Sequence, residues 1–336
     1  MPRTYAKIYV PVDNSGHSFA AIDLAVDMAV KLDASLAGSH VFEAGATDSY
    51  LDLMEECCRT ASVRFERRTL GGRHHKTLLE DIAGGDYDLV IMGALGAGAV
   101  DESQIGSVTE RVVRGATVDI LVVKDLIPND GPILVAVDGS SQSLEALCAA
   151  ITFAGATGRG VEGVVVAEAP LARATSAALE SARARAEAEG TDLEFIVTEG
   201  KPFDRILKTC REKKPWLLVV GKTGADAEAG DDLAALGSTT GNLLRLAPCN
   251  VLVTPGSPVH ERRTEPAGAA AAAAVTAPAE RRLLTWTPDA ERLLEDVPGE
   301  QRLEMIRTVE QGARKLGITV ITADTIDRVM LGYIDS

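Results

Sequence analysis

The chain has 336 residues, a formal net charge of -15 and a sequence pI near 4.9. This length accommodates two or three domains that each bury a core. The acidic balance and the 4% aromatic content argue against a nucleic-acid-binding protein, because such proteins present a basic face or stacking aromatic side chains. A small nucleotide is still compatible with this charge, since its binding needs only a few local backbone donors.

The N-terminal residues lead directly into a predicted strand, without the apolar core of a signal peptide. No apolar run approaches the ~20 residues of a membrane span. The five cysteines are odd in number and form no C-x-x-C pair. We therefore expect a reduced, cytoplasmic protein that binds no membrane and whose cysteines pack as small apolar residues, with a redox or metal role as the alternative.

Residues 1–128 alternate apolar runs with segments of helical periodicity. The predicted strands cover 8–13, 35–42, 63–70, 88–92 and 118–123, and the predicted helices cover 17–32, 48–61, 76–83 and 108–115. This alternation predicts an α/β fold with a doubly wound parallel sheet and helices on both faces. Ligands of such sheets bind at the carboxyl ends of the strands, where the strand order reverses.

A glycine-rich loop follows the fourth predicted strand. It reads Gly93-x2-Gly96-x9-Gly106-Ser107 and leads into a predicted helix. Glycines let backbone N–H groups approach an anion closely, and the helix start adds unpaired N–H groups and the positive end of its dipole. A Rossmann fingerprint fails because Asp101 stands where a glycine is required, and a P-loop around Lys222 fails at Trp216. The pattern therefore predicts a phosphate site of another type.

Val10-Pro11-Val12-Asp13 and the glycine loop together resemble the nucleotide-binding signature of the universal stress protein family. The segments 106–111 and 119–123 resemble the closing helix and strand of that family. The resemblance implies the strand order 3-2-1-4-5, which would bring Asp13 to the glycine loop, and it implies ATP, with or without magnesium, as ligand. The residues that it assigns to the site are Pro11, Val12, Asp13, Val41, Met92, Gly93, Gly96, Gly106, Ser107 and Val108.

Some of these residues have a structural alternative. Asp13 is interpreted as a ribose or adenine acceptor, with a cap of the following helix as the alternative. Pro11, Val12 and Met92 would form an apolar wall around the adenine base. Ser107 and Glu110 form an S-x-x-E capping box, which a bound phosphate would complement. The pair His74-His75 suggests a metal, but a solvated turn is favoured, so no metal site is expected.

The unit repeats over residues 129–256, with offsets of 125, 128 and 131 for the acid, the first loop glycine and the glycine before the helix. The second candidate site comprises Val137, Asp138, Gly221, Gly224, Gly237 and Ser238. Its spacer has twelve residues, four of them acidic (Asp226, Glu228, Asp231 and Asp232), with Lys222 as a partial offset. We expect this site to be empty or to depend on a divalent cation.

The remaining chain consists of a predicted linker at 257–282 and a small helical domain at 283–336. Thr287-Pro288 is predicted to start one helix and Thr322 to cap another. Segments 286–291 and 297–298 and the residues around Gly317 resemble the small C-terminal domain of light-independent protochlorophyllide reductase B subunits. The reductase activity does not transfer, because the tail has no cysteine for an iron–sulfur cluster.

The predicted function is that of a nucleotide-binding regulatory protein of the stress response, without catalysis of its own but with slow ATP hydrolysis left open. The alternatives are an interaction module without a ligand, or an accessory factor of tetrapyrrole or photosynthetic metabolism. The edge strands at 118–123 and 251–254 are expected to pair within the chain as a pseudo-two-fold dimer, because exposed edges otherwise pair promiscuously. A protein partner and a homo-oligomer are further expectations.

Overall fold

The computed structural model describes residues 3–13, 15–42, 49–96, 105–124, 129–167, 173–191, 193–224, 236–255, 285–287 and 320–330, and single residues between 290 and 313. The chain divides into two compact units, Met1–Arg263 and Thr264–Ser336. The predicted linker at 257–282 lies outside the described residues. None of the helices in the described ranges is long and apolar enough to cross a membrane.

The first half of the larger unit alternates strands and helices as predicted, with bounds that differ by a few residues. Its elements are β1 (Lys7–Pro11), α1 (Gly16–Leu32), β2 (Ser35–Phe42), α2 (Ser49–Thr60), β3 (Phe65–Gly71), α3 (His74–Gly84), β4 (Leu89–Gly93), α4 (Ser107–Gly115) and β5 (Asp119–Val123).

The second half repeats this order. Its elements are β6 (Ile133–Val137), α5 (Ser141–Thr157), β7 (Val161–Ala167), α6 (Arg173–Ala188), β8 (Glu194–Glu199), α7 (Pro202–Lys213), β9 (Leu217–Gly221), α8 (Ser238–Leu246) and β10 (Asn250–Thr254). The repeat extends to the helix caps. The side chain of Ser15 accepts the Ser18 N–H at the start of α1, and that of Ser140 accepts the Ser143 N–H at the start of α5.

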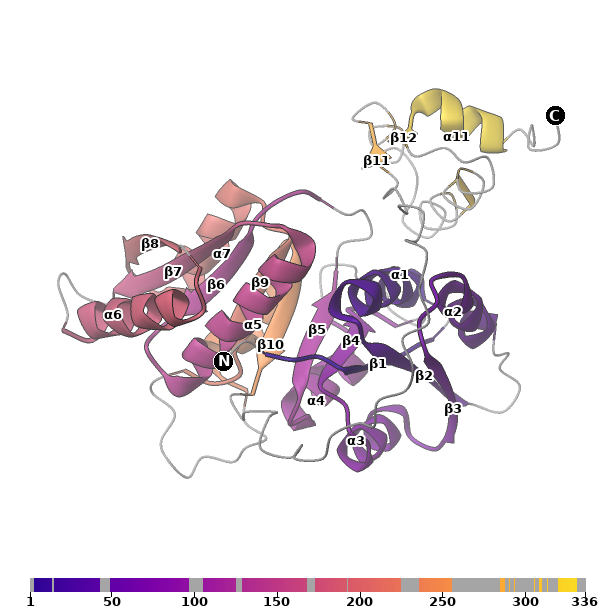
Figure 1. Ribbon diagram of the computed structural model, residues 1–336, viewed down its shortest axis with the longest axis horizontal. Helices are drawn as coiled ribbons and strands as arrows, with labels where there is room; N and C mark the ends of the chain where they lie inside the picture. Colours follow the sequence, from indigo (N-terminus) through magenta and orange to yellow (C-terminus); the bar gives the residue numbers. More distant parts are fainter. Residues whose placement is uncertain are drawn as a thin grey trace. The chain divides into compact units, whose positions relative to one another are not determined.

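The ten strands form one sheet in the order β3-β2-β1-β4-β5-β10-β9-β6-β7-β8. Each half has the predicted order 3-2-1-4-5 and is parallel throughout. The two predicted sheets are continuous because β5 and β10 pair antiparallel, with Leu121 opposite Leu252 (Figure 1). The predicted pairing of these edge strands is confirmed, and each edge protects the other from pairing with a different chain.

Successive strand residues alternate between two apolar cores, one on each face of the sheet. Leu89 and Ile91 of β4 face the core that contains buried residues of α1, α2, α5 and α6. Val90 and Met92 face the core that contains α3, α4, α7 and α8. Each core includes residues of both halves, which explains why Met1–Arg263 behaves as one compact unit.

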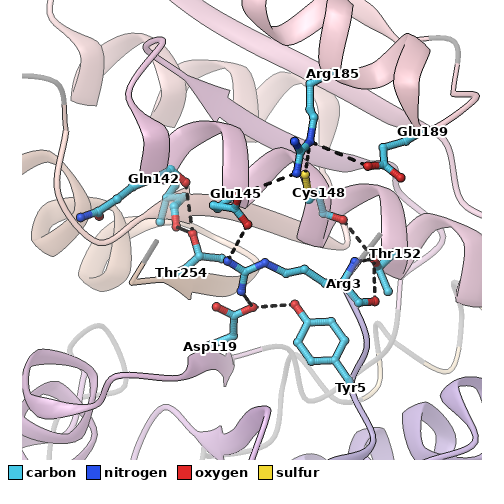
Figure 2. A network of polar contacts seen from close by, with 11 residues as sticks. Arg3, Tyr5, Asp119, Gln142, Glu145, Cys148, Thr152, Arg185, Glu189 and Thr254 are labelled. Carbon is cyan, nitrogen blue, oxygen red and sulfur yellow. Dashed lines mark hydrogen bonds and ion pairs between the residues drawn. The ribbon is translucent and has the colours of Figure 1, made fainter. Parts of the chain in front are cut away.

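The N-terminal segment ties the first half to the second through a buried polar network (Figure 2). The Arg3 guanidinium pairs with Asp119 at the start of β5 and donates to Glu145 of α5 at 3.3 Å. The Tyr5 hydroxyl donates to the same Asp119 carboxylate at 2.6 Å. Burial disfavours the charge of Arg3 and is the largest single influence on it, but the combined attraction of Asp119, Tyr5 and Glu145 outweighs burial and raises the pKa of Arg3 above its ordinary value.

Lysines reinforce the seam between the halves, which is the junction of β5 and β10, because each of them binds the end of a helix. Lys124 Nζ donates to Ala247 O, at the end of α8, at 2.7 Å. Lys222 Nζ donates to Ala116 O, at the end of α4, at 3.1 Å. Ala116 and Ala247 are equivalent positions in the repeat. In each half, the last helix is therefore capped by a lysine from the other half. The negative ends of both helix dipoles favour this arrangement.

The smaller unit is described only in part. Strands β11 (Thr285–Trp286) and β12 (Val320–Ile321) pair in parallel, and helix α11 (Ala323–Met330) follows β12. The Thr325 N–H donates to Thr322 Oγ1 at 3.2 Å, which confirms Thr322 as the predicted cap. Thr287 is bound to Ile321 O, whereas Pro288 and Gly317 lie outside the described residues.

Candidate functional site

The candidate site lies at the carboxyl ends of β1 and β4, which are neighbours in the sheet. The strand order reverses between them, because β2 and β3 lie on the β1 side and β5 lies on the β4 side. Asp13 follows β1 and Gly93 ends β4. The structure therefore brings the predicted acid and the predicted glycine loop to one place, the topological switch point where such folds bind ligands.

Asp13 organises the turn that precedes α1, close to the structural role predicted as the alternative, whereas its role as a ribose or adenine acceptor stays a prediction. Its Oδ1 accepts the Ser15 N–H at 3.0 Å and the Ser18 hydroxyl at 2.7 Å, which organises the turn into α1. Its Oδ2 points to the glycine loop, because a Cβ built on Gly96 would lie 2.8 Å from this atom. One carboxylate oxygen thus stabilises the turn before α1, whose cap is Ser15, while the other faces the candidate site.

The loop glycines are required by close packing. A Cβ on Gly93 would lie 2.8 Å from the His17 backbone carbon, and one on Gly106 would lie 3.3 Å from Ala94 O. None of Gly93, Gly96 and Gly106 has a positive φ. Gly93 therefore lets the end of β4 pack against the first turn of α1, and Gly106 lets the start of α4 approach Ala94; neither glycine serves a left-handed backbone conformation.

The predicted capping box at Ser107 is wrong. Helix α4 is capped by Gly106, and no side-chain cap bond is found among the described residues. Ser107 is already inside the helix, so its hydroxyl does not face the Glu110 N–H. Glu110 instead accepts from Arg114 at 2.9 Å and from Arg245 of the second half at 2.7 Å. Among the described residues, no side chain therefore accepts the N–H groups of the first turn of α4.

Helix α4 is anchored to the loop from its buried side. The Thr109 hydroxyl donates to Gly93 O at 3.0 Å, and the Gly106 N–H donates to Ala94 O at 2.8 Å. Gly96 and Ser107 are exposed, whereas Val108 is half-buried. The two described ends of the loop are therefore tied to each other, and Gly96 and the first turn of α4 lie at the surface.

The predicted apolar wall divides between the two faces of the sheet. Val41 and Met92 lie in the core of α3 and α4, whereas Val12 lies in the core of α1 and α2. All three side chains are buried, and so is Pro11. Only Val41 and Met92 can form a common wall. His40, which precedes Val41 in β2 and belongs to none of the predicted motifs, donates its Nδ1–H to Val12 O at 2.9 Å.

The second half reproduces the frame of the first. Asp138, which follows Val137, accepts the Ser140 N–H at 2.9 Å, and its Oδ2 lies 3.0 Å from a Cβ built on Gly224. Gly237 caps α8, which begins at Ser238. The Thr240 hydroxyl donates to Gly221 O at 2.8 Å, as Thr109 does to Gly93 O in the first half.

Lys222 makes a contact across the seam that its position next to the second loop did not predict. Its side chain is buried and its Nζ reaches Ala116 O across the seam. Whether this lysine also offsets the acidic spacer stays a prediction, because the spacer acids are not among the described residues. Asp101 of the first spacer and the four spacer acids Asp226, Glu228, Asp231 and Asp232 lie outside the described residues.

The His74-His75 pair opens helix α3 rather than lying in a turn. His75 Nδ1 lies 3.4 Å from Arg111 Nη1 of the neighbouring α4. No group of three or more His, Cys, Asp or Glu side chains that could hold a metal is found within the described ranges. Of the cysteines, Cys58, Cys148, Cys210 and Cys249 are buried and Cys57 is half-buried.

Comparison with known proteins gives consistent matches over both halves. The model of the universal stress protein family matches residues 49–124 and 131–255. A universal stress protein of Methanocaldococcus jannaschii is 26% identical over 140 residues, which cover 36% of this chain and 82% of the relative.

Solved structures also match. A universal stress protein of Archaeoglobus fulgidus has 21% identity and a TM-score of 0.58, covering 74% of this chain and 97% of its own. A universal stress protein in complex with cAMP has 25% identity and a TM-score of 0.32, covering 36% of this chain and 97% of its own. With its two repeated α/β halves and its two matched segments, the chain belongs to the universal stress protein family.

Proposed function

We propose that the first half binds an adenine nucleotide of the ATP type, and that its occupancy regulates a protein partner in the stress response. The observation that carries the proposal is the meeting of Asp13 Oδ2 with Gly96 beside the start of α4. This arrangement sets a ribose or base acceptor next to backbone N–H donors that suit phosphate. Magnesium would supply charge compensation for the phosphates when bound.

We further propose that the site binds without fast turnover. The predicted first-site residues include one acid and one hydroxyl, Asp13 and Ser107, but no general base adjacent to a nucleophile. The lysine of the second loop is engaged elsewhere, since Lys222 caps α4 across the seam. Binding rather than catalysis is therefore the role that these side chains support.

Isothermal titration calorimetry of the whole chain with ATP, ADP, cAMP and GTP, each with and without magnesium, tests this function. We expect ATP to bind, and the Gly96→Ala variant to bind at least tenfold more weakly, because its Cβ would displace the Asp13 carboxylate. Gly71→Ala is the matched control, since a Cβ there meets nothing within 4 Å. If no nucleotide produces heat at millimolar concentration, the ligand-free interaction module is the better description.

The tail does not enter this proposal. The family model matches only residues 49–124 and 131–255. The resemblance of residues 283–336 to the small domain of protochlorophyllide reductase B subunits therefore stays a sequence-based prediction. A role in tetrapyrrole or photosynthetic metabolism stays one as well. Removal of residues 264–336, followed by the same titration, would show whether the tail changes nucleotide affinity.

A further inference from the structure

A side chain of the protein itself already accepts a hydrogen bond from a backbone N–H group of the second glycine loop. The Gln142 side chain, in the first turn of α5, accepts the Thr223 N–H through Oε1 at 2.7 Å. Thr223 lies between Gly221 and Gly224, so this N–H is one of the backbone donors of the loop. A carboxamide oxygen at this distance makes the kind of hydrogen bond that a phosphate oxygen would make there.

Gln142 is held in this position by its surroundings. Its Cβ lies 3.1 Å from a Cβ built on Gly221, and its backbone oxygen accepts from Thr254 Oγ1 at 3.4 Å (Figure 2). The side chain is half-buried, so solvent reaches it only in part. The contact is therefore part of the packing of α5 against the end of β9, and the carboxamide needs little ordering to reach the loop.

The first half has a different residue at the equivalent place. The repeat offset of 125 relates Gln142 to His17, and the offset of 128 relates Thr223 to Leu95. His17 packs against Gly93 as Gln142 packs against Gly221. Within the described residues of the first half, no side chain is seen to accept the Leu95 N–H. The two loops thus share their backbone frame but differ in whether a side chain occupies this donor.

We propose that Gln142 is an internal ligand of the second loop, which a nucleotide phosphate must displace before it binds there. The inference rests on the proposed function, because it assumes that these loops bind nucleotide phosphates. It assigns the inequality of the two sites to one side chain in the described structure. An exchange of one intramolecular hydrogen bond of this kind lowers the affinity of the second loop about three- to tenfold.

The test uses the whole chain with the first site weakened by Gly96→Ala, so that ATP titration in magnesium reports the second loop. Adding Gln142→Ala is expected to raise ATP affinity about three- to tenfold. Gln142→Glu is the matched control. It keeps an acceptor of the same length and adds a negative charge, so it should bind no better than the parent. Amide hydrogen exchange at Thr223 should accelerate in Gln142→Ala and not in Gln142→Glu.

The reciprocal change is His17→Gln in the otherwise unaltered chain. It should weaken ATP binding at the first site by a similar factor, because it supplies an acceptor for the Leu95 N–H. Unchanged affinity in Gln142→Ala, while the unaltered chain still binds ATP, would overturn the inference and leave the proposed function standing. Absence of ATP binding in the unaltered chain and in every variant would overturn both.

Discussion

The two halves of the larger unit show how one backbone frame acquires different chemistry. Asp13 and Asp138 each turn the chain into a helix and point the second carboxylate oxygen to a loop glycine. The frame is the same because the strand order and the close glycine contacts are the same. The halves diverge at side chains that leave the frame intact, such as His17 against Gln142. Site chemistry can therefore change without a change of fold.

The seam is also asymmetric in detail. Asp119 begins β5 and pairs with Arg3, whereas Asn250 begins β10 at the equivalent position and binds Trp216 O and the Lys124 N–H. One half thus uses a buried ion pair where the other uses a neutral amide. This difference allows each type of interaction to be removed separately.

The largest expected effect comes from Asp119→Asn, which makes the start of β5 resemble the start of β10. Arg3 would keep its charge in a buried position while losing Asp119, the closer of its two carboxylate partners, and keeping Glu145 at 3.3 Å. Such a loss costs about 3–5 kcal/mol of the free energy of unfolding. Urea denaturation of the whole chain, followed by circular dichroism, measures it. The double variant Arg3→Met/Asp119→Leu should recover much of the loss, and a single-variant loss below about 1 kcal/mol would contradict the role assigned to the pair.

A smaller effect is expected from adding one methyl group to each loop. Gly93→Ala must displace the His17 backbone, 2.8 Å away, whereas Gly221→Ala meets the Gln142 Cβ at 3.1 Å. We expect Gly93→Ala to destabilise the protein by about 1–3 kcal/mol, and Gly221→Ala by less. Gly155→Ala is the control, because a Cβ there meets nothing within 4 Å and should stabilise α5 by about 0.5–1 kcal/mol. Equal losses of the free energy of unfolding in the two variants would show that the first loop accommodates a methyl group as easily as the second loop does.

The smallest effect concerns Glu110, whose equivalent in the second half is Gly241. The hydrogen bond from Arg114, assisted by Arg245 and opposed by burial, lowers the pKa of Glu110 below its ordinary value. The ion pairs therefore stabilise the fold above the pKa of an unfolded glutamate, near 4.3, and this contribution is lost as the pH falls through the lower folded value.

Replacement by glutamine should cost about 0–1 kcal/mol at pH 7, and the difference from the parent should vanish on acidification. Denaturant unfolding at pH 7, 5, 4 and 3 measures this difference. A difference that stays constant over this range would mean that Glu110 acts through packing alone.

Several features of the fold and of the candidate site were predictable from local pattern. The apolar run before Gly93 and the turn at Asp13 predict the strand ends and their neighbouring helices, because backbone propensity and burial act over a few residues. The 125-residue offset of Asp138 indicates the second half. The partners of polar side chains were not predictable, as the contact of Lys222 with Ala116 O and the wrong capping box at Ser107 show. A lysine next to a glycine loop does not reveal that its ammonium group reaches a helix end 106 residues earlier.

The sequence by itself determined the alternating strands and helices, the tandem repeat and the residues at the strand ends. These follow from hydrophobic periodicity and from glycine and acid positions along the chain. Only the tertiary structure decided that Arg3 is buried against Asp119, that Lys222 reaches the end of α4, and that Gln142 accepts the Thr223 N–H of the second loop. The reason is physical: these contacts join distant segments, and their partners become neighbours only when the whole sheet has formed.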